Sequence, residues 1–138
     1  MALFLVDTNV ISEARKGRKS NAGVQDFFRS ESAGTLFLSA QTIGEIRRGI
    51  ENLRCRRDLS QVRALELWLD FLLKEYADRI LAFDLECAQH WGRLMSPDAA
   101  HAVDKQIAAI ALMYDMTIVT RNVGDFRDAH VRVQNPFA

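Results

Sequence analysis

The sequence predicts an α/β fold in which helices cover both faces of a mostly parallel sheet. Short apolar runs of strand length alternate along the chain with longer segments that have helical spacing. Strands that alternate with helices are typical of a parallel sheet with both faces covered. The 138 residues fit one domain, and no repeat, low-complexity tract or proline-rich segment marks a linker. We therefore expect residues 1–138 to form a single domain.

Five short apolar runs are the expected strands. They cover residues 3–6, 35–38, 80–83, 117–120 and 131–133. Ser39 directly follows the second run and can cap a helix that extends from about residue 40 to residue 50.

A second helix is predicted over residues 61–77, where apolar side chains form one stripe at helical spacing. The stripe consists of Leu65, Trp68, Leu69, Leu72 and Tyr76. Leu67, Phe71 and Leu73 widen it beyond what one buried face needs. This excess indicates either deeper burial or contact with a protein partner.

The charge of the chain is balanced overall but uneven along its length. A net charge of zero argues against a general polyanion binder. Residues 1–63 nevertheless hold 11 Lys and Arg against 7 Asp and Glu, with basic clusters at 15–19 and 47–57. These clusters fit either contacts to a phosphate backbone or an ordinary solvated face.

The absence of a signal peptide or long apolar run favours a cytoplasmic protein without a membrane segment, with Cys55 and Cys87 reduced.

Acidic residues follow two of the expected strands. Asp7 ends the first apolar run, and Asp125 lies in the loop after the run at 117–120. Parallel strands place such loops at the same edge of the sheet, where α/β proteins bind ligands. Asp104 lies near the start of a third helix, bordering its buried face. If these acids and Glu45 meet, they form an oxygen-only site for a hard divalent cation, which points to metal-dependent hydrolysis of a phosphodiester.

Each acid also has a purely structural interpretation. Asp7 could belong to an Asx-type turn into the next helix, with Thr8 or Asn9 as the cap of that helix, and Asp104 could complement a helix dipole. Asp125 could belong to an ordinary polar loop together with Asn122. On a helical wheel Glu45 falls opposite the apolar residues of its helix, which is typical of a solvated acid.

No histidine or nucleophile arrangement competes with the acids. The three histidines have no close metal-ligand spacing, and no Ser-His-Asp or Cys-His arrangement has local support. His101 lies one turn from Asp104, where we expect a surface or supporting position rather than a direct role.

Four segments together resemble the PIN-domain ribonucleases, and most closely the VapC and FitB-like toxins of prokaryotic toxin–antitoxin systems. They are Leu5-Val6-Asp7-Thr8-Asn9-Val10-Ile11-Ser12, Glu45-Ile46-Arg47-Arg48-Gly49-Ile50, Asp104-Lys105-Gln106-Ile107-Ala108-Ala109 and Thr120-Arg121-Asn122-Val123-Gly124-Asp125-Phe126. Their order and separations fit that family along the whole chain.

The resemblance implies a three-layer α/β/α sandwich with an acidic metal site. Asp7, Glu45, Asp104 and Asp125 would surround Mg²⁺, or alternatively Mn²⁺. Among the supporting residues, Asn122 would assist through hydrogen bonds or water, Thr120 would hold the loop or the acids, and Asn9 would stand beside Asp7. This list, and the inclusion of Glu45, depends on the resemblance.

The resemblance also implies an activity and partners. The chain would be a metal-dependent endoribonuclease that acts as a toxin, with a small DNA-binding antitoxin, and it would form a homodimer. Two alternatives stay open: a binding module that keeps the fold without the chemistry, and a phosphatase with Asp7 as nucleophile. The phosphatase would want a second carboxylate where the chain has Asn9. A DNA nuclease is a further alternative, although no clamping insertion is evident.

Overall fold

The centre of the molecule is a five-stranded sheet in the order β3-β2-β1-β4-β5. A computed structural model describes all residues from 1 to 138. The strands are β1 (Phe4–Val6), β2 (Leu36–Ser39), β3 (Ile80–Leu81), β4 (Thr117–Val119) and β5 (Val133–Gln134). All pairings between neighbouring strands are parallel, which confirms the predicted parallel sheet. The first strand in the sequence therefore lies in the middle of the sheet.

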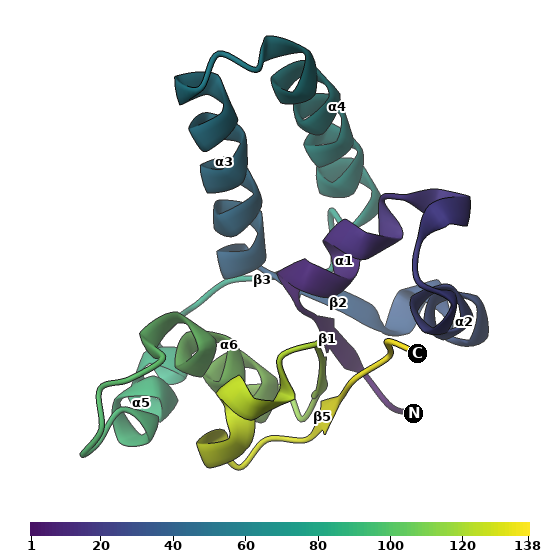
Figure 1. Ribbon diagram of the computed structural model, residues 1–138. Helices are drawn as coiled ribbons and strands as arrows, with labels where there is room; N and C mark the ends of the chain where they lie inside the picture. Colours follow the sequence, from purple (N-terminus) through teal and green to yellow (C-terminus); the bar gives the residue numbers. More distant parts are fainter.

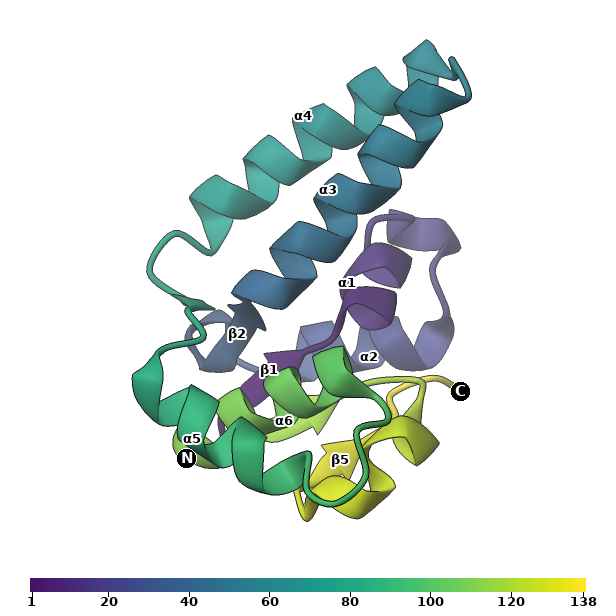
Figure 2. The same cartoon turned by 90° about the vertical axis from the view of Figure 1, so that its left-hand side faces the viewer.

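Helices cover both faces of this sheet, so the protein is a three-layer α/β/α sandwich (Figures 1 and 2). The helices are α1 (Thr8–Ala14), α2 (Ala22–Ser30), α3 (Ala40–Cys55), α4 (Leu59–Glu75), α5 (Leu85–Leu94) and α6 (Ala102–Met113). Short 3-10 helices are η1 (Gly17–Lys19), η2 (Ala33–Thr35) and η3 (Val123–Ala129). None of these helices combines the length and the apolar character that crossing a membrane requires.

Side chains of the central strand β1 point alternately to the two faces of the sheet, and each face has its own part of the hydrophobic core. Phe4 and Val6 pack with buried residues of α1, α2, α3 and α4. Leu5 points to the other face and packs with α5, α6 and η3. Successive strand residues point to opposite faces, so each residue of this apolar strand is buried by a different layer.

The predicted elements all occur, with shifted ends. Ser39 caps α3 as expected, since its Oγ accepts a hydrogen bond of 3.1 Å from the amide of Thr42. This helix extends five residues beyond the predicted end, to Cys55. The predicted strand at 80–83 ends at Leu81, because Asp84 already caps α5 through a 3.0 Å bond from the amide of Cys87.

The pair of helices α3 and α4 projects away from the sheet as an antiparallel hairpin (Figure 2). Its inner stripe, including Leu69 and Leu72, is buried as predicted. The three extra apolar residues, Leu67, Phe71 and Leu73, are exposed in this chain. Deeper burial within the chain is therefore wrong as an explanation for them.

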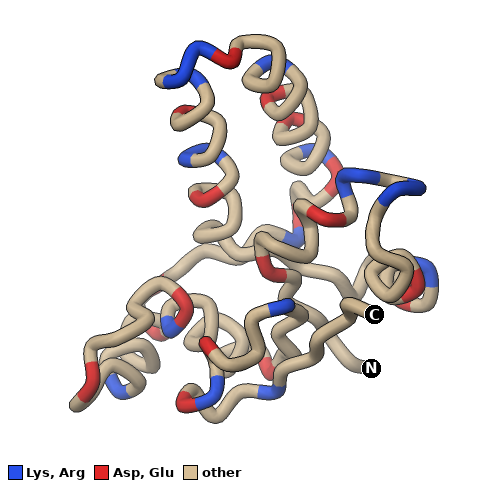
Figure 3. The backbone as a smooth tube through the Cα atoms, in the orientation of Figure 1, with Lys and Arg blue, Asp and Glu red and all other residues tan.

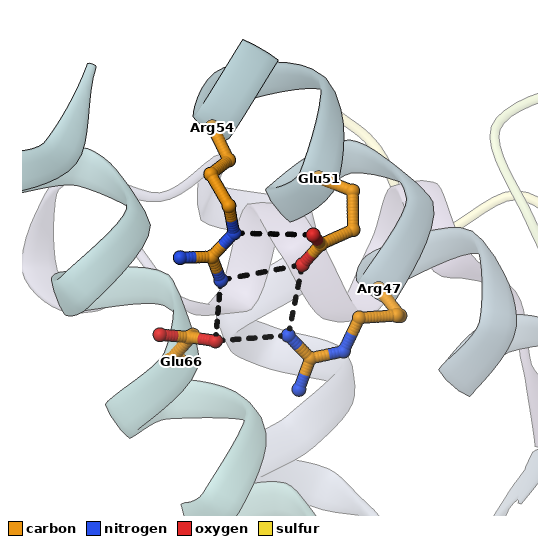
Figure 4. Close-up of polar contacts among 4 residues, drawn as sticks. All are labelled: Arg47, Glu51, Arg54 and Glu66. Atoms are coloured by element: carbon orange, nitrogen blue, oxygen red, sulfur yellow. Dashed lines mark hydrogen bonds and ion pairs between the residues drawn. The ribbon is translucent and has the colours of Figure 1, made fainter. Parts of the chain in front are cut away.

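Four charged residues join the two helices of this hairpin (Figure 4). Arg47 and Arg54 of α3 each lie within 3.3 Å of carboxylate oxygens of Glu51 and of Glu66 on α4. All four side chains are substantially exposed, so the network orients the helices more than it stabilises them. Part of the basic cluster at 47–57 is thus neutralised by acids, while other basic residues remain at the tip of the hairpin (Figure 3).

Candidate active site

Asp7 joins the end of the central strand to the start of α1. Its Oδ1 accepts a bond of 2.9 Å from the amide of Thr8, so Asp7 itself caps the helix, and the expectation of a cap at Thr8 or Asn9 was wrong. Its Oδ2 accepts hydrogen bonds from the Thr120 hydroxyl at 2.8 Å and from the side-chain amide of Asn9 at 3.3 Å. The residue is only 7% exposed. Burial raises the pKa of Asp7, these three hydrogen bonds oppose the rise, and the charge of Asp125 adds to it.

Thr120 holds Asp7 from the neighbouring strand. Its fully buried hydroxyl donates to Asp7 and accepts bonds of 3.1 Å from the Asn9 side chain and from the Asn122 amide. Asn9 in turn accepts a bond of 2.9 Å from the amide of Arg121. A hydroxyl has one donor and two acceptor sites, so this one is fully used. Thr120 and Asn9, which the resemblance implied as supporting residues, thus both hydrogen-bond to Asp7.

Replacing Thr120 with Val should destabilise the protein by roughly 1.5–3 kcal/mol, because a buried carboxylate loses a hydrogen bond while the shape is kept. The pKa of Asp7 should rise further, since the Thr120 hydroxyl is its largest stabilising contact. Thermal unfolding followed by circular dichroism measures the first effect, and NMR titration of the carboxyl measures the second. Thr120→Ser keeps the hydroxyl and should leave the pKa close to that of the wild type. Equal pKa values in Thr120→Val and the wild type would refute this role.

Asp104 and Asp125 lie close together, with one carboxylate oxygen of each within 4.8 Å of the other. Asp104 lies in the first turn of α6, and Asp125 lies in η3, after β4. Burial raises the pKa of Asp104, and the charges of Asp125, Asp7 and Glu45 raise it further, in that order. Repulsion of this kind requires proximity. The geometry forms two adjoining pairs from four separate segments: Asp104 with Asp125, whose ligand atoms lie within 4.8 Å, and Asp7 with Glu45, which both accept hydrogen bonds from Thr8.

Glu45 reaches this region across the gap between two helices. It is exposed, as the helical wheel indicated, but its Oε1 lies 2.8 Å from the hydroxyl of Thr8 on α1. The Thr8 hydroxyl also lies 3.1 Å from Thr42, one turn earlier on α3. A helical wheel shows where a residue lies relative to the buried face of its own helix. It does not show whether a second helix lies opposite. A solvated position and a place at the acidic site are thus compatible.

Asn122 contributes through its backbone. Its amide donates to Thr120, and its carbonyl accepts a bond of 3.1 Å from the amide of Asp125. Its side chain is exposed and makes no hydrogen bond within the chain. The contact between Asn122 and the acids is therefore indirect in this structure.

His101, expected at a surface or supporting position, is exposed and lies beside two of the acids. One ligand atom from each of His101, Asp104 and Asp125 lies within 4.8 Å of the others. The histidine precedes α6 in a left-handed backbone conformation, with φ of 58°. A left-handed conformation is uncommon for residues other than glycine, and the neighbouring residues in the sequence do not predict it.

A cleft of about 490 Å³ lies beside Glu45, the one of the four acids that lines it. Thr8, Asn9 and Glu45 line its acidic end. Its walls belong to α1, α3 and α4, and they carry basic and apolar side chains, among them Arg15, Lys16, Arg56 and Trp68. The Arg15 guanidinium lies 5.7 Å from the centre of the Trp68 ring. The basic clusters at 15–19 and 47–57, which contribute Arg15, Lys16 and Arg56, were the sequence signals for this surface.

A family model for the PIN domain matches residues 4–130. The chain belongs to the PIN-domain family. This PIN domain resembles curated relatives over 98% of its length and about 99% of theirs. It is 36% identical to "Plasmid stability protein StbB" of Pseudomonas syringae pv. tomato and 33% identical to "Toxin FitB" of Neisseria gonorrhoeae. It is 32% identical to "VapC ribonuclease Y4jK" of Sinorhizobium fredii, again over 98% of both chains.

Solved structures support the same relationship. This PIN domain superimposes on a chain of the FitAcB crystal structure from Neisseria gonorrhoeae with a TM-score of 0.85 and 34% identity, covering 97% of this chain and 98% of that one. A chain of FitAB bound to an IR36 DNA fragment gives a TM-score of 0.82 at 32% identity, covering 99% and 96%. The resemblance to PIN-domain proteins and the α/β/α fold are thus both confirmed.

Proposed function

We propose that this PIN domain is a metal-dependent endoribonuclease that hydrolyses RNA phosphodiester bonds and acts as the toxin of a toxin–antitoxin pair. The observation that carries the proposal is that Asp104 lies close to Asp125, while Thr8 hydrogen-bonds to both Asp7 and Glu45, and that Glu45 also lines a cleft with basic side chains. The relatives named as a VapC ribonuclease and as toxin FitB, each matched along nearly its whole length, support the same activity.

The donor set fits a hard divalent cation, Mg²⁺ or Mn²⁺. Such ions prefer carboxylate oxygens, and Mg²⁺ keeps several waters, so direct contact with every acid is unnecessary. We assign Asp7 and Asp104 as direct ligands, with Glu45 and Asp125 completing the site directly or through water. Burial and, after it, the charges of neighbouring acids raise the pKa of Asp7 and of Asp104, and a bound cation would offset both effects. When bound, the cation would supply charge neutralisation at the phosphate and a water with a lowered pKa.

The residues around the acids prepare the site. Thr120, Asn9 and the Thr8 amide fix the carboxylate of Asp7 before any ligand arrives. Thr8 also orients Glu45 through its hydroxyl. A carboxylate that is already fixed loses little conformational entropy on binding its ligand.

The cleft offers a path for the RNA strand. Lys16 already pairs with Glu13 at 2.9 Å, whereas Arg15 and Arg56 of the same cleft are exposed and make no ion pair. These side chains can neutralise successive phosphates, while Trp68 offers an aromatic surface. Arg47 and Arg54 are less suited to that task, because Glu51 and Glu66 already pair with them.

The proposed partner is a small DNA-binding antitoxin, as in the FitAB and VapBC complexes that share this fold. An open reading frame for such a protein directly upstream, with a product that copurifies with this chain and blocks cleavage, would support it. We further propose a cytoplasmic homodimer, for which the exposed Leu67 and Phe71 offer an apolar surface. A monomer at micromolar concentration in sedimentation would refute the dimer.

The activity is tested by incubating the purified chain with RNA and with DNA of the same sequence, in Mg²⁺, in Mn²⁺ and in EDTA. We expect internal cleavage of RNA that depends on the cation. A cellular effect that persists after chelation and active-site substitution would favour the binding module instead. An aspartyl phosphate trapped on Asp7 by a metal fluoride would favour the phosphatase.

A further inference from the structure

The imidazole of His101 stands at the edge of the acidic site. Its Nδ1 lies 3.7 Å from Asp104 Oδ2, and the two residues are one helical turn apart. Asp125 completes a group of three ligand atoms, all within 4.8 Å of one another. The cluster is therefore not built from carboxylates alone.

These separations suit donors that share one cation. Ligand atoms bonded at about 2.1 Å to an octahedral ion lie about 3 Å apart when adjacent and about 4.2 Å apart when opposite. A side-chain movement of less than about 1 Å would bring the three atoms into that range. The His101 side chain is free to make this movement, because it is 53% exposed and makes no helix-capping hydrogen bond.

The backbone also presents His101 in a defined place. Its carbonyl accepts the first hydrogen bond of α6, from the amide of Lys105 at 2.9 Å. Its left-handed conformation, unusual for a residue with a side chain, is one that histidine adopts more often than most. Since α6 is packed against the sheet through buried alanines and isoleucines, the position of this residue is tied to the core.

We propose that His101 is a nitrogen ligand of the divalent-cation site and makes the site prefer transition-metal ions such as Mn²⁺ over Mg²⁺. The proposal rests on the proposed function, since it concerns the same cation. Imidazole is a frequent ligand of first-row transition metals, and Mn²⁺, although it accepts the same oxygen ligands as Mg²⁺, also accepts a nitrogen, whereas Mg²⁺ keeps oxygen ligands and water. One nitrogen among carboxylates therefore adds more to the affinity for Mn²⁺ than to the affinity for Mg²⁺.

His101→Gly tests this ligand without straining the backbone, because glycine adopts the left-handed conformation freely. His130→Gly is a matched control: His130 is also exposed, and its φ of 54° is nearly the same. Calorimetry measures Mn²⁺ and Mg²⁺ binding to each full-length protein. Pulsed electron paramagnetic resonance of bound Mn²⁺ detects coupling to the imidazole nitrogen, and this signal is independent of catalysis.

We expect nitrogen coupling in the wild type and in His130→Gly, and its loss in His101→Gly. The affinity for Mn²⁺ should fall about tenfold or more in His101→Gly, while the affinity for Mg²⁺ changes by less than about threefold. Mn²⁺ that binds the wild type without nitrogen coupling, or coupling that survives in His101→Gly, would overturn the assignment of His101 alone. Failure of the wild type to bind either cation would overturn the proposed metal site as well.

Discussion

Asp104→Asn should reduce RNA cleavage at least about 100-fold, because loss of a ligand weakens a metal site more than loss of a supporting partner does. The substitution keeps the size of the side chain and removes only its charge. Asp104 borders the buried face of α6, so its position depends on the helix and not on the substituted oxygen. Cleavage of a labelled RNA in saturating Mn²⁺ measures the effect.

Asp128→Asn is the matched control for this experiment. This substitution removes the same charge from a residue of η3, three positions beyond Asp125. The Asp128 side chain is exposed and makes no ion pair. We expect near wild-type cleavage. If Asp104→Asn cleaved RNA as fast as Asp128→Asn does, Asp104 would not be a ligand.

The same substitution should have opposite effects on stability with and without the cation. In EDTA, Asp104→Asn should unfold at a higher temperature than the wild type, because burial and three neighbouring acids disfavour the charged carboxylate. In Mn²⁺ at 100 times its dissociation constant, binding should stabilise the wild type by about 2.7 kcal/mol. Mn²⁺ should stabilise the variant much less, so in Mn²⁺ the wild type should unfold at the higher temperature.

The advantage of the variant in EDTA should depend on pH. The pKa of Asp104 is raised in the folded protein above its ordinary value of 3.8. Below pH 3.8 the carboxyl is protonated in the folded and the unfolded chain alike, so it imposes no penalty and the two proteins should converge. As the pH rises through the raised pKa, the wild type loses stability relative to the variant. Thermal unfolding at several pH values measures the difference, and an advantage that grew toward low pH would contradict this origin.

The sequence alone could place three of the acids because their positions follow from secondary structure. Asp7 and Asp125 come after strands, and parallel strands bring their ends to one edge. The phase of α6 placed Asp104 at the border of the buried face. The pairing of β1 directly with β4 then brings the loops of Asp7 and Asp125 together.

The rest of the site depends on contacts between helices that periodicity does not encode. Glu45 is solvated on its own helix and joins the site through Thr8 of α1. The cleft depends on how far the α3 and α4 hairpin stands from α1, which no residue pattern states. His101 depends on one left-handed residue before a helix. In each case tertiary geometry decides the outcome, so family resemblance was the only guide to Glu45, and the only guide to His101 was its spacing of one turn from Asp104.

The most direct test of the central claim is a crystal of this chain soaked in Mn²⁺ and measured for anomalous scattering. We predict a peak between Asp7, Asp104 and Asp125, with Glu45 within reach directly or through a water. Nitrogen of His101 should lie at bonding distance from the same peak if the further inference holds. A strong peak elsewhere on the molecule, with none among these carboxylates, would contradict the assignment of the four acids to one metal site.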